Sequence, residues 1–425
     1  MFMATVRGFP HDVIGMRRAL HRFPECGFLE YRTAACVAER LAELGYDLRI
    51  GPEVMRADAM LAPPTAAAIA QAQQAALDMG AGPEWIARMP EGQTAVVADM
   101  RRGAGPVTAL RFDIDALPVA EAESDAHRPF REGFASIRPG RMHACGHDGH
   151  TAIGLAVAAA LASPESRWRG TLRLIFQPAE EGGRGALPLV EAGVVDDVDL
   201  FFAGHLGCLL PSGQVATAAN GFLWAVKQDV IFRGAPAHAA MAPQLGRNAL
   251  LAAAAAALGL HAMPRDGDGV THVNVGTVRA GTARNVIADH AVIEMEYRGE
   301  TEEILASLAK RVDDIVQGAA RMQDVAVETI PCGRSIGIAP DREAMRRVAE
   351  AAGRIGVGSV VEEWPIGGGD DATYFMRRVR ERGGHAGYCL IGADLSAGHH
   401  AGTFDFDEAA LPVAVRLFTA LVEGA

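Results

Sequence analysis

The chain has 425 residues, which is more than one hydrophobic core usually supports, so its length predicts two domains. Hydrophobic residues make up 49% of the chain and charged residues 22%, which are proportions typical of a soluble globular protein. The formal net charge of −12 argues against a nucleic-acid partner and an anionic membrane surface, because both attract basic proteins.

The sequence contains six cysteines without the dense, regular spacing of a disulfide-stabilised scaffold. They are Cys26, Cys36, Cys145, Cys208, Cys332 and Cys389. The first ten residues lack the apolar core of a signal peptide, and the alanine-rich runs fall short of the roughly 20 apolar residues that span a membrane. These features predict a cytoplasmic protein with reduced thiols.

The first half of the chain alternates between helical and strand patterns. Residues 12–45 predict two helices joined by a loop, and residues 53–92, which are rich in Ala and Gln, predict a helical insertion. The pattern then predicts strands at 94–98, 107–112, 171–176 and 200–203, and helices at 151–161 and after Gly185. Strands that alternate with helices indicate a parallel sheet.

The pattern changes near residue 216. From there the chain predicts the order β-α-β-β-α-β, the split βαβ unit of a compact α+β domain. The expected elements are strands at 227–232, 272–278, 291–297 and 325–330, and helices at 247–263 and 302–322. We therefore expect an inserted domain at 216–332 and a discontinuous domain of residues 1–215 and 333–425. The returning chain predicts a helix at 341–354, a strand at 388–391 and a closing helix.

Polar side chains follow several of the predicted strands at the point where each strand ends. Asp113 and Asp115 follow one strand, Glu180 and Glu181 follow the next, and His205 follows a third. Ligands of parallel sheets bind beyond the carboxyl ends of the strands, so these segments deliver polar groups to one edge. Asp115 there either orients a metal-binding histidine or caps a helix, and both alternatives stay open.

Residues 142–150 concentrate three imidazoles, a thiol and a carboxylate. If this segment runs extended through its middle, His143, Cys145 and His147 share one face, which is a metal-ligand geometry. We interpret Cys145 and His147 as metal ligands, and His143 and His150 as ordinary polar groups. Because no second Cys-x-x-Cys or Cys/His block exists, further ligands must come from distant parts of the chain.

The loop after the strand at 171–176 holds the adjacent carboxylates Glu180 and Glu181, with Pro and Gly around them. Neighbouring residues of a loop can point in different directions, so one can bind a metal while the other addresses water. That division suits hydrolysis, because a divalent cation lowers the pKa of its water to about 7 and a nearby carboxylate takes the proton. The alternative is a solvated acidic turn.

Further candidates lie in the inserted domain and near the C-terminus. His238 follows the first strand of the inserted domain, where it can stabilise an oxyanion when a mobile domain closes. Asn285 in a turn and Arg298 at a strand end suit the binding of a carboxylate. His400 precedes Phe404 and is a further candidate ligand.

With these residues in place, the sequence resembles the metal-dependent aminoacylase/carboxypeptidase family of peptidases, in its amidohydrolase branch. The resemblance covers nearly the whole chain and depends on six motifs. They lie at 21–25 (His-Arg-Phe-Pro-Glu), 112–118 (Phe-Asp-Ile-Asp-Ala-Leu-Pro), 142–150, 176–182, 283–287 (Ala-Arg-Asn-Val-Ile) and 399–400 (His-His). One departure is Gly369-Asp370-Asp371, where the family usually has Ser-Glu-Asp.

The resemblance implies an α/β fold of the two-metal exopeptidase type. A mixed sheet flanked by helices would carry an inserted α+β, ferredoxin-like domain that acts as lid and dimerisation domain. Two divalent metal ions, Mn²⁺ or Zn²⁺, would be held by Cys145, His147, Glu181, His205 and His400. The spacing to Phe404 favours His400 over His399 as the ligand.

The resemblance also implies roles for the remaining candidates. Glu180 would be the general base and acid, and Asp115 would orient a metal ligand. His238 would reach the site, including that of a neighbouring subunit, because the inserted domain dimerises in this family. Asn285 and Arg298 match residues that contact the substrate's carboxylate.

The leading hypothesis is a metal-dependent hydrolase of N-acyl amino acids, which cleaves the amide between an aromatic acyl group and glutamate. One alternative is a hydrolase of other N-acyl amino acids, such as indole-acetyl conjugates. A second is a cysteine hydrolase with Cys145 as nucleophile, and a third is a subunit that needs a homologous partner. The expected partners are a small-molecule substrate and an identical or homologous subunit, with neither nucleic acid nor membrane.

Overall fold

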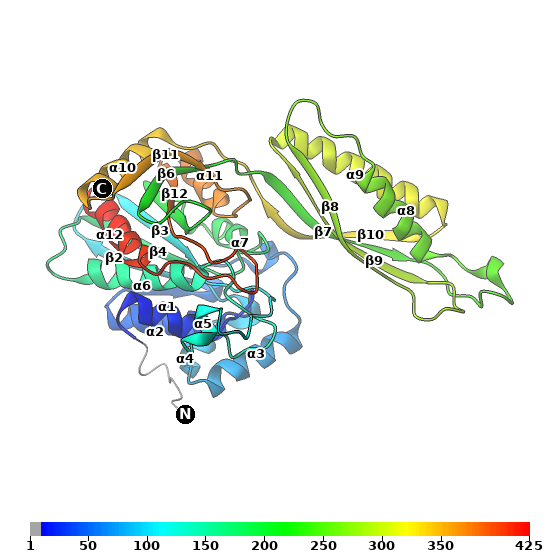
Figure 1. The fold of residues 1–425 in the computed structure, drawn as a ribbon, viewed down its shortest axis with the longest axis horizontal. Helices are drawn as coiled ribbons and strands as arrows, with labels where there is room; N and C mark the ends of the chain where they lie inside the picture. Colours follow the sequence, from blue (N-terminus) through cyan, green and yellow to red (C-terminus); the bar gives the residue numbers. More distant parts are fainter. Residues whose placement is uncertain (1–9) are drawn as a thin grey trace. The chain divides into compact units, whose positions relative to one another are not determined.

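The computed structural model describes residues 10–425, which form two compact units. Of the described residues, the first unit contains 10–220 and 338–425, and the second contains 221–337. The second unit is therefore an insertion into the first, and each has its own sheet and core (Figure 1).

An eight-stranded sheet with the order β1-β2-β4-β3-β5-β12-β6-β11 forms the centre of the first unit. Its strands are β1 (Asp47–Ile50), β2 (Val96–Arg102), β3 (Val107–Asp113), β4 (Gly170–Gln177), β5 (Leu200–Leu206), β6 (Gln214–Asn220), β11 (Ser359–Pro365) and β12 (His385–Ile391). The four strands β4, β3, β5 and β12 run parallel, as the sequence predicted. Antiparallel pairs β1/β2, β2/β4 and β12/β6 surround them, so the sheet is mixed, as the family resemblance implied.

Helices cover both faces of this sheet. The helices of this unit are α1 (Val13–His21), α2 (Tyr31–Glu43), α3 (Ala66–Asp78), α4 (Pro83–Ile86), α5 (Arg128–Arg131), α6 (His147–Ala162), α7 (Ala186–Glu191), α10 (Arg342–Arg354), α11 (Thr373–Glu381) and α12 (Ala410–Glu423), of which α3 packs on α2. Side chains of a strand alternate between faces. Thus Phe202 of β5 belongs to the core that α6, α10 and α12 share, while Phe201 stacks on Phe375 of α11 at 5.6 Å between ring centroids.

Five elements of the first unit were not predicted, namely β1, β6, β11, α11 and the four-residue α5. The burial pattern explains why β11 was missed, because this edge strand is exposed on both faces and has no apolar alternation. β1 has only four residues, and β6 is built mainly from small residues. α11 contains four arginine and glutamate side chains and buries only Thr373, Phe375, Met376 and Val379.

The second unit is a four-stranded antiparallel sheet with the order β10-β7-β9-β8. Its elements are β7 (Trp224–Arg233), α8 (Ala249–His261), β8 (Thr271–Ala280), β9 (His290–Gly299), α9 (Glu302–Met322) and β10 (Ala326–Ser335). Val230, Phe232 and Ile293 of the sheet form one core with α8 and α9. The predicted β-α-β-β-α-β order and the ferredoxin-like architecture are confirmed.

Among the described residues, no helix combines the length and the apolar character needed to cross a bilayer.

Candidate metal centre

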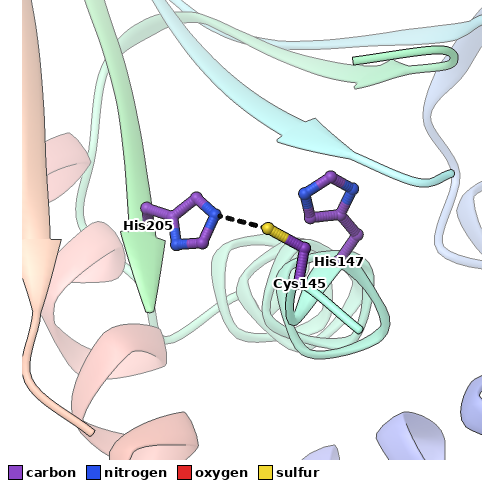
Figure 2. Close-up of side chains that lie close together, drawn as sticks. All are labelled: Cys145, His147 and His205. Carbon is purple, nitrogen blue, oxygen red and sulfur yellow. Dashed lines mark hydrogen bonds between the residues drawn. The ribbon is translucent and has the colours of Figure 1, made fainter. Parts of the chain in front are cut away.

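The segment before α6 bends where the sequence analysis expected it to run straight. Met142 pairs with Leu117 in an isolated bridge, Gly146 has a positive φ of 97°, and α6 begins at His147. Because the chain turns between Cys145 and His147, the expectation of one extended face shared with His143 is wrong. Cys145 and His147 nevertheless come together, because a bend and a helix start replace the strand (Figure 2).

His143 and His150, interpreted from the sequence as ordinary polar groups, differ in their surroundings: the His150 ring lies 5.4 Å from that of His147 and 4.6 Å from that of His205. The His143 ring is buried, and its centroid lies 6.4 Å from that of the His21 ring. Burial lowers the pKa of His143 to about 3. His150 contacts Asp113 through Nδ1 at 2.6 Å, and its Nε2 accepts a hydrogen bond from the backbone N–H of Leu206 at 3.0 Å. Both ring nitrogens of His150 are therefore occupied.

Two ligand triads share the Cys145 thiol. In the first, one ligand atom each of Cys145, His147 and His205 lies within 4.8 Å of the others. Figure 2 shows His147 at the start of α6 and His205 on β5, with 3.5 Å between Cys145 Sγ and His205 Nε2. The second triad joins Cys145 to Glu181 and His400, whose Nε2 lies 3.2 Å from Glu181 Oε2. The five side chains named from the sequence as ligands thus gather in one cluster.

The histidines of the first triad direct their Nε2 atoms toward the cluster. His205 Nδ1 donates to the carbonyl of Leu206 at 2.7 Å, and His147 Nδ1 lies 3.0 Å from the carbonyl and 3.2 Å from Oδ1 of Asp115. Donation from Nδ1 leaves the Nε2 lone pair free to bind a cation. His147 Nε2 is buried and makes no hydrogen bond to any residue that the structure describes, which fits a metal ligand.

Asp115 supports two members of the cluster at once. Besides contacting His147, its Oδ2 accepts a hydrogen bond from the backbone N–H of Glu181 at 3.1 Å. No helix follows Asp115, so the helix-capping alternative is wrong and orientation of the cluster remains. Asp113, two residues earlier, pairs with Arg111 Nη1 at 2.7 Å through Oδ2 and contacts His150 Nδ1 at 2.6 Å through Oδ1.

Glu180 and Glu181 have opposite pKa shifts. Burial raises the pKa of Glu180 well above its ordinary value, and the nearby Asp370, Glu181 and Asp371 act in the same direction. Burial also opposes ionisation of Glu181, but contact with His400 and the proximity of His147 lower its pKa. Two carboxyl groups with separated pKa values are suited to different roles, one as a ligand and one as a proton carrier. Glu180 Oε2 lies 3.9 Å from His147 Nε2.

His399, the less favoured of the two neighbouring histidines, and Cys208, which was not expected, belong to the same neighbourhood. His399 Nδ1 lies 3.6 Å from Cys145 Sγ, and its Nε2 accepts a hydrogen bond from the backbone N–H of Cys208 at 3.2 Å. Cys208 Sγ lies 3.4 Å from His205 Nδ1. His399 therefore contacts the Cys145 thiol, while His400 contacts Glu181. The adjacent pair His399-His400 was the only sequence feature that indicated two different contacts at this position.

The Asp370-Asp371 pair, the departure from the family pattern, lies in a buried ionic network. The Arg111 guanidinium is fully buried and contacts Asp113, Asp370 and Asp371 within 3.3 Å. Asp371 also accepts from Gln177 Nε2 at 2.7 Å and from two backbone N–H groups, and the Tyr388 hydroxyl donates to Asp370 at 2.5 Å. A single arginine inside an apolar strand gave no sequence signal for this network.

The second unit brings His238 and Asn285 together. His238 pairs with Val286 in an isolated bridge, and the backbone N–H of Ala239 donates to the carbonyl of Asn285 at 3.0 Å. Nδ1 of His238 accepts hydrogen bonds from the N–H groups of Ala240 and Met241 at 3.2 and 3.1 Å. These contacts place the ring proton on Nε2, so His238 offers a fixed N–H donor.

Arg298 lies at the other end of the same sheet. It pairs with Ala225 at the start of β7, whereas His238 follows the end of that strand. The Arg298 guanidinium contacts Glu296 through three hydrogen bonds of 3.0 to 3.2 Å. Within the second unit the structure thus brings together two of the three expected residues, and leaves Arg298 apart.

Comparison with known proteins agrees with this geometry. The profile of peptidase family M20/M25/M40 matches residues 109–424. The chain belongs to this family. It is 45% identical to indole-3-acetyl-aspartic acid hydrolase of Enterobacter agglomerans over 97% of this chain and 95% of that protein. It is 44% identical to a subunit of p-aminobenzoyl-glutamate hydrolase from Escherichia coli K12 over 94% and 92%, respectively.

Solved structures show the same fold. An aminobenzoyl-glutamate utilization protein from Klebsiella pneumoniae matches with a TM-score of 0.83 and 37% identity, over 99% of this chain and 97% of that one. A dinuclear metal-binding peptidase of the family from Bacillus subtilis matches with a TM-score of 0.65 and 27% identity, over 97% and 96%. The family resemblance, the fold class and the expectation of a hydrolytic enzyme are confirmed.

Proposed function

We propose that this protein is a metal-dependent amidohydrolase that cleaves p-aminobenzoyl-glutamate to p-aminobenzoate and glutamate. The observation that carries the proposal is the pair of ligand triads sharing Cys145, with the raised-pKa carboxyl of Glu180 beside them. The names of the two relatives add the substrate class, because both describe an aromatic acyl group joined to an acidic amino acid. Indole-3-acetyl-aspartate is therefore the second candidate substrate.

The proposed centre holds two divalent cations, Mn²⁺ or Zn²⁺. Cys145 would be shared, with His147 and His205 completing one site and Glu181 and His400 the other. The mixture of thiolate, imidazole and carboxylate donors suits zinc and is compatible with manganese. When bound, such cations would polarise the scissile carbonyl and lower the pKa of water to about 7, so that the nucleophilic hydroxide forms near neutral pH.

The chain's own residues would then move protons and hold the substrate. Glu180 would take a proton from the attacking water at one carboxylate oxygen and deliver it to the leaving nitrogen. Asp115 would keep His147 and the Glu181 backbone in place. From the inserted domain, the Nε2–H of His238 would stabilise the developing oxyanion in a neighbouring subunit's centre. Asn285 would bind the α-carboxylate of the amino acid, with Arg298 as the less well placed candidate for the same role.

We further propose that the inserted domain, expected at 216–332, is the lid and dimerisation domain. Its β8 is an edge strand, and an unpaired sheet edge is a template for pairing with another chain. The neighbouring α8 has no Asp, Glu, Lys or Arg and exposes Leu251 and Leu258. Exposed apolar surface of this kind supports a subunit interface, formed with an identical chain or a homologous one. Light scattering of the purified chain would show a dimer, and a monomer that is fully active would contradict this assignment.

The thiol chemistry disfavours a cysteine hydrolase. Burial and the nearby Glu181 raise the pKa of Cys145 well above its ordinary value, whereas a nucleophilic cysteine needs a lowered pKa. All six cysteines are free, which supports the proposed cytoplasmic location because reduced thiols persist there.

The test is an assay of p-aminobenzoyl-glutamate and indole-3-acetyl-aspartate with chelated protein, before and after addition of Mn²⁺ or Zn²⁺. We expect activity to return only with metal. The Glu180→Gln variant should keep its metal and lose turnover, while the exposed control Glu350→Gln should behave as wild type. Activity that survives chelation and disappears on thiol alkylation would instead indicate the cysteine mechanism.

A further inference from the structure

Arg184 lies on the turn that carries the candidate catalytic carboxylates. The backbone N–H of Gly183 donates to the carbonyl of Glu180 at 2.6 Å, and that of Arg184 donates to the carbonyl of Ala179 at 3.2 Å. The turn therefore closes on itself within a few residues of Glu181. Its compactness keeps the Arg184 backbone next to the proposed metal ligands.

The Arg184 guanidinium is held in a defined position. Its Nη1 donates to the carbonyl of Ala62 at 3.0 Å, and its Cζ lies 5.1 Å from the centroid of the Phe28 ring. A Cβ placed on Gly27 would lie 2.6 Å from its Nη2, and one placed on Gly182 would also collide with the side chain. Two glycines and an aromatic ring thus make room for this guanidinium, with Gly182 directly following Glu181.

No carboxylate pairs with this guanidinium among the residues that the structure describes, and its buried Nε has no hydrogen-bond partner there. Three of the four buried arginines, Arg17, Arg111 and Arg173, each contact at least two carboxylates, whereas the fourth, Arg32, stacks on Phe23. A guanidinium has five N–H donors, and its fork geometry matches a carboxylate. Arg184 therefore has unused donors for an anionic ligand.

The chemistry of the proposed substrate leaves one anionic group to be bound. A conjugate of glutamate or aspartate carries two carboxylates, and Asn285 is assigned to only one of them. The chain has a net charge of −12 and places Glu180, Glu181, Asp370 and Asp371 around the candidate site. A second carboxylate needs a local cation to enter such surroundings.

We propose that Arg184 binds the side-chain carboxylate of the substrate's acidic amino acid, an inference that rests on the proposed function. The insertion at 53–92 then has a role, because its Ala62 carbonyl holds Nη1 and directs the remaining donors of the guanidinium. Arg184 is a binding and specificity residue, and the insertion determines its orientation.

The experiment compares p-aminobenzoyl-glutamate with p-aminobenzoyl-glutamine, in which a neutral amide of nearly the same shape replaces the carboxylate. We expect Arg184→Gln to lower kcat/KM for the glutamate conjugate on the order of 100-fold, mainly through KM, because it removes one partner of a charge pair. The glutamine conjugate should change little, so the preference of the wild type for glutamate should collapse. Arg184→Lys should be intermediate, because it keeps the charge and loses the fork. The control Arg56→Gln removes an exposed arginine of the same insertion and should leave both substrates unaffected.

The outcomes separate the two proposals. Equal losses on both substrates in Arg184→Gln and Arg184→Lys, or no loss in either variant, would overturn the role of Arg184 while the proposed function stands. A metal-loaded wild type that hydrolyses neither p-aminobenzoyl conjugates nor indole-3-acetyl-aspartate would overturn the proposed function itself.

Discussion

Replacement of Asp115 by Asn tests how the candidate metal centre is held together. The carboxylate contacts His147 Nδ1 through Oδ1 at 3.2 Å and accepts the Glu181 backbone N–H through Oδ2 at 3.1 Å. An asparagine of the same shape has one oxygen and one NH₂ group, so it can accept only one of these two N–H donors. The ligand histidine then keeps only the Asp115 backbone carbonyl, 3.0 Å from His147 Nδ1, or the ligand-bearing loop loses its side-chain acceptor.

The expected effect is on metal affinity. Removing a hydrogen-bond partner of a metal-binding histidine typically costs 10- to 100-fold in affinity. That range corresponds to about 1.4–2.8 kcal/mol of binding free energy. The fold should survive, because Asn occupies the same volume as Asp.

The assay is competition for Zn²⁺ with a fluorescent chelator, performed on the apoprotein at one pH. The control is Asp99→Asn, which removes a carboxylate of β2 that pairs with Arg173 of β4 and Arg49 of β1. We expect weaker metal binding in Asp115→Asn and unchanged binding in the control. Equal affinities in wild type and Asp115→Asn would refute the assigned role of Asp115.

Three further predictions follow from other parts of the structure. Arg111→Gln should destabilise the first unit by about 3–5 kcal/mol, because it leaves three carboxylates buried without their cation. Urea unfolding should show this loss of stability, and the exposed control Arg346→Gln should unfold as the wild type does. Contacts with arginines lower the pKa values of Asp405 and Glu408 below their ordinary 3.8 and 4.5, although both carboxyl groups are buried. The two carboxylates therefore stabilise the folded protein above pH 4.5, and this contribution is lost as the pH falls through the lowered pKa values. The melting temperature of Asp405→Asn should therefore depend less on pH below 4.5 than that of wild type, and parallel curves would contradict this. Finally, mixing inactive His238→Ala with inactive Glu180→Gln should restore activity if His238 serves a neighbouring subunit. A mixed dimer then has one intact site, which combines Glu180 of one subunit with His238 of the other. No recovery after subunit exchange would place His238 in its own subunit's site.

Much of the fold was predictable because its strands and helices carry strong periodic patterns. α9 was predicted with its observed bounds, and the amphipathic spacing of Ile304, Leu308 and Val312 explains this success. The edge strand β11 gave no such signal, since it is exposed on both faces. The start of α6 was missed because His147 and Asp148, which are polar, occupy a buried helix start whose partners come from distant segments.

The candidate site was predictable where residue types are unusual and not where they depend on tertiary contacts. Cys145, Glu180 and Glu181 stand out because thiols and paired carboxylates near strand ends are typical of metal chemistry. Arg184 became a candidate only from its neighbour, the Ala62 carbonyl, whereas the sequence already offered His399 as the alternative to His400. The role of Arg298 stays a prediction, since its charge suggested carboxylate binding while its guanidinium contacts Glu296 in the structure.

The most direct test of the central claim is an anomalous difference map from crystals of the protein loaded with Zn²⁺, recorded at the zinc absorption edge. The account predicts two peaks that share Cys145 Sγ, one beside His147 and His205 and the other beside Glu181 and His400. A single peak, or two peaks of which neither contacts Cys145, would contradict it.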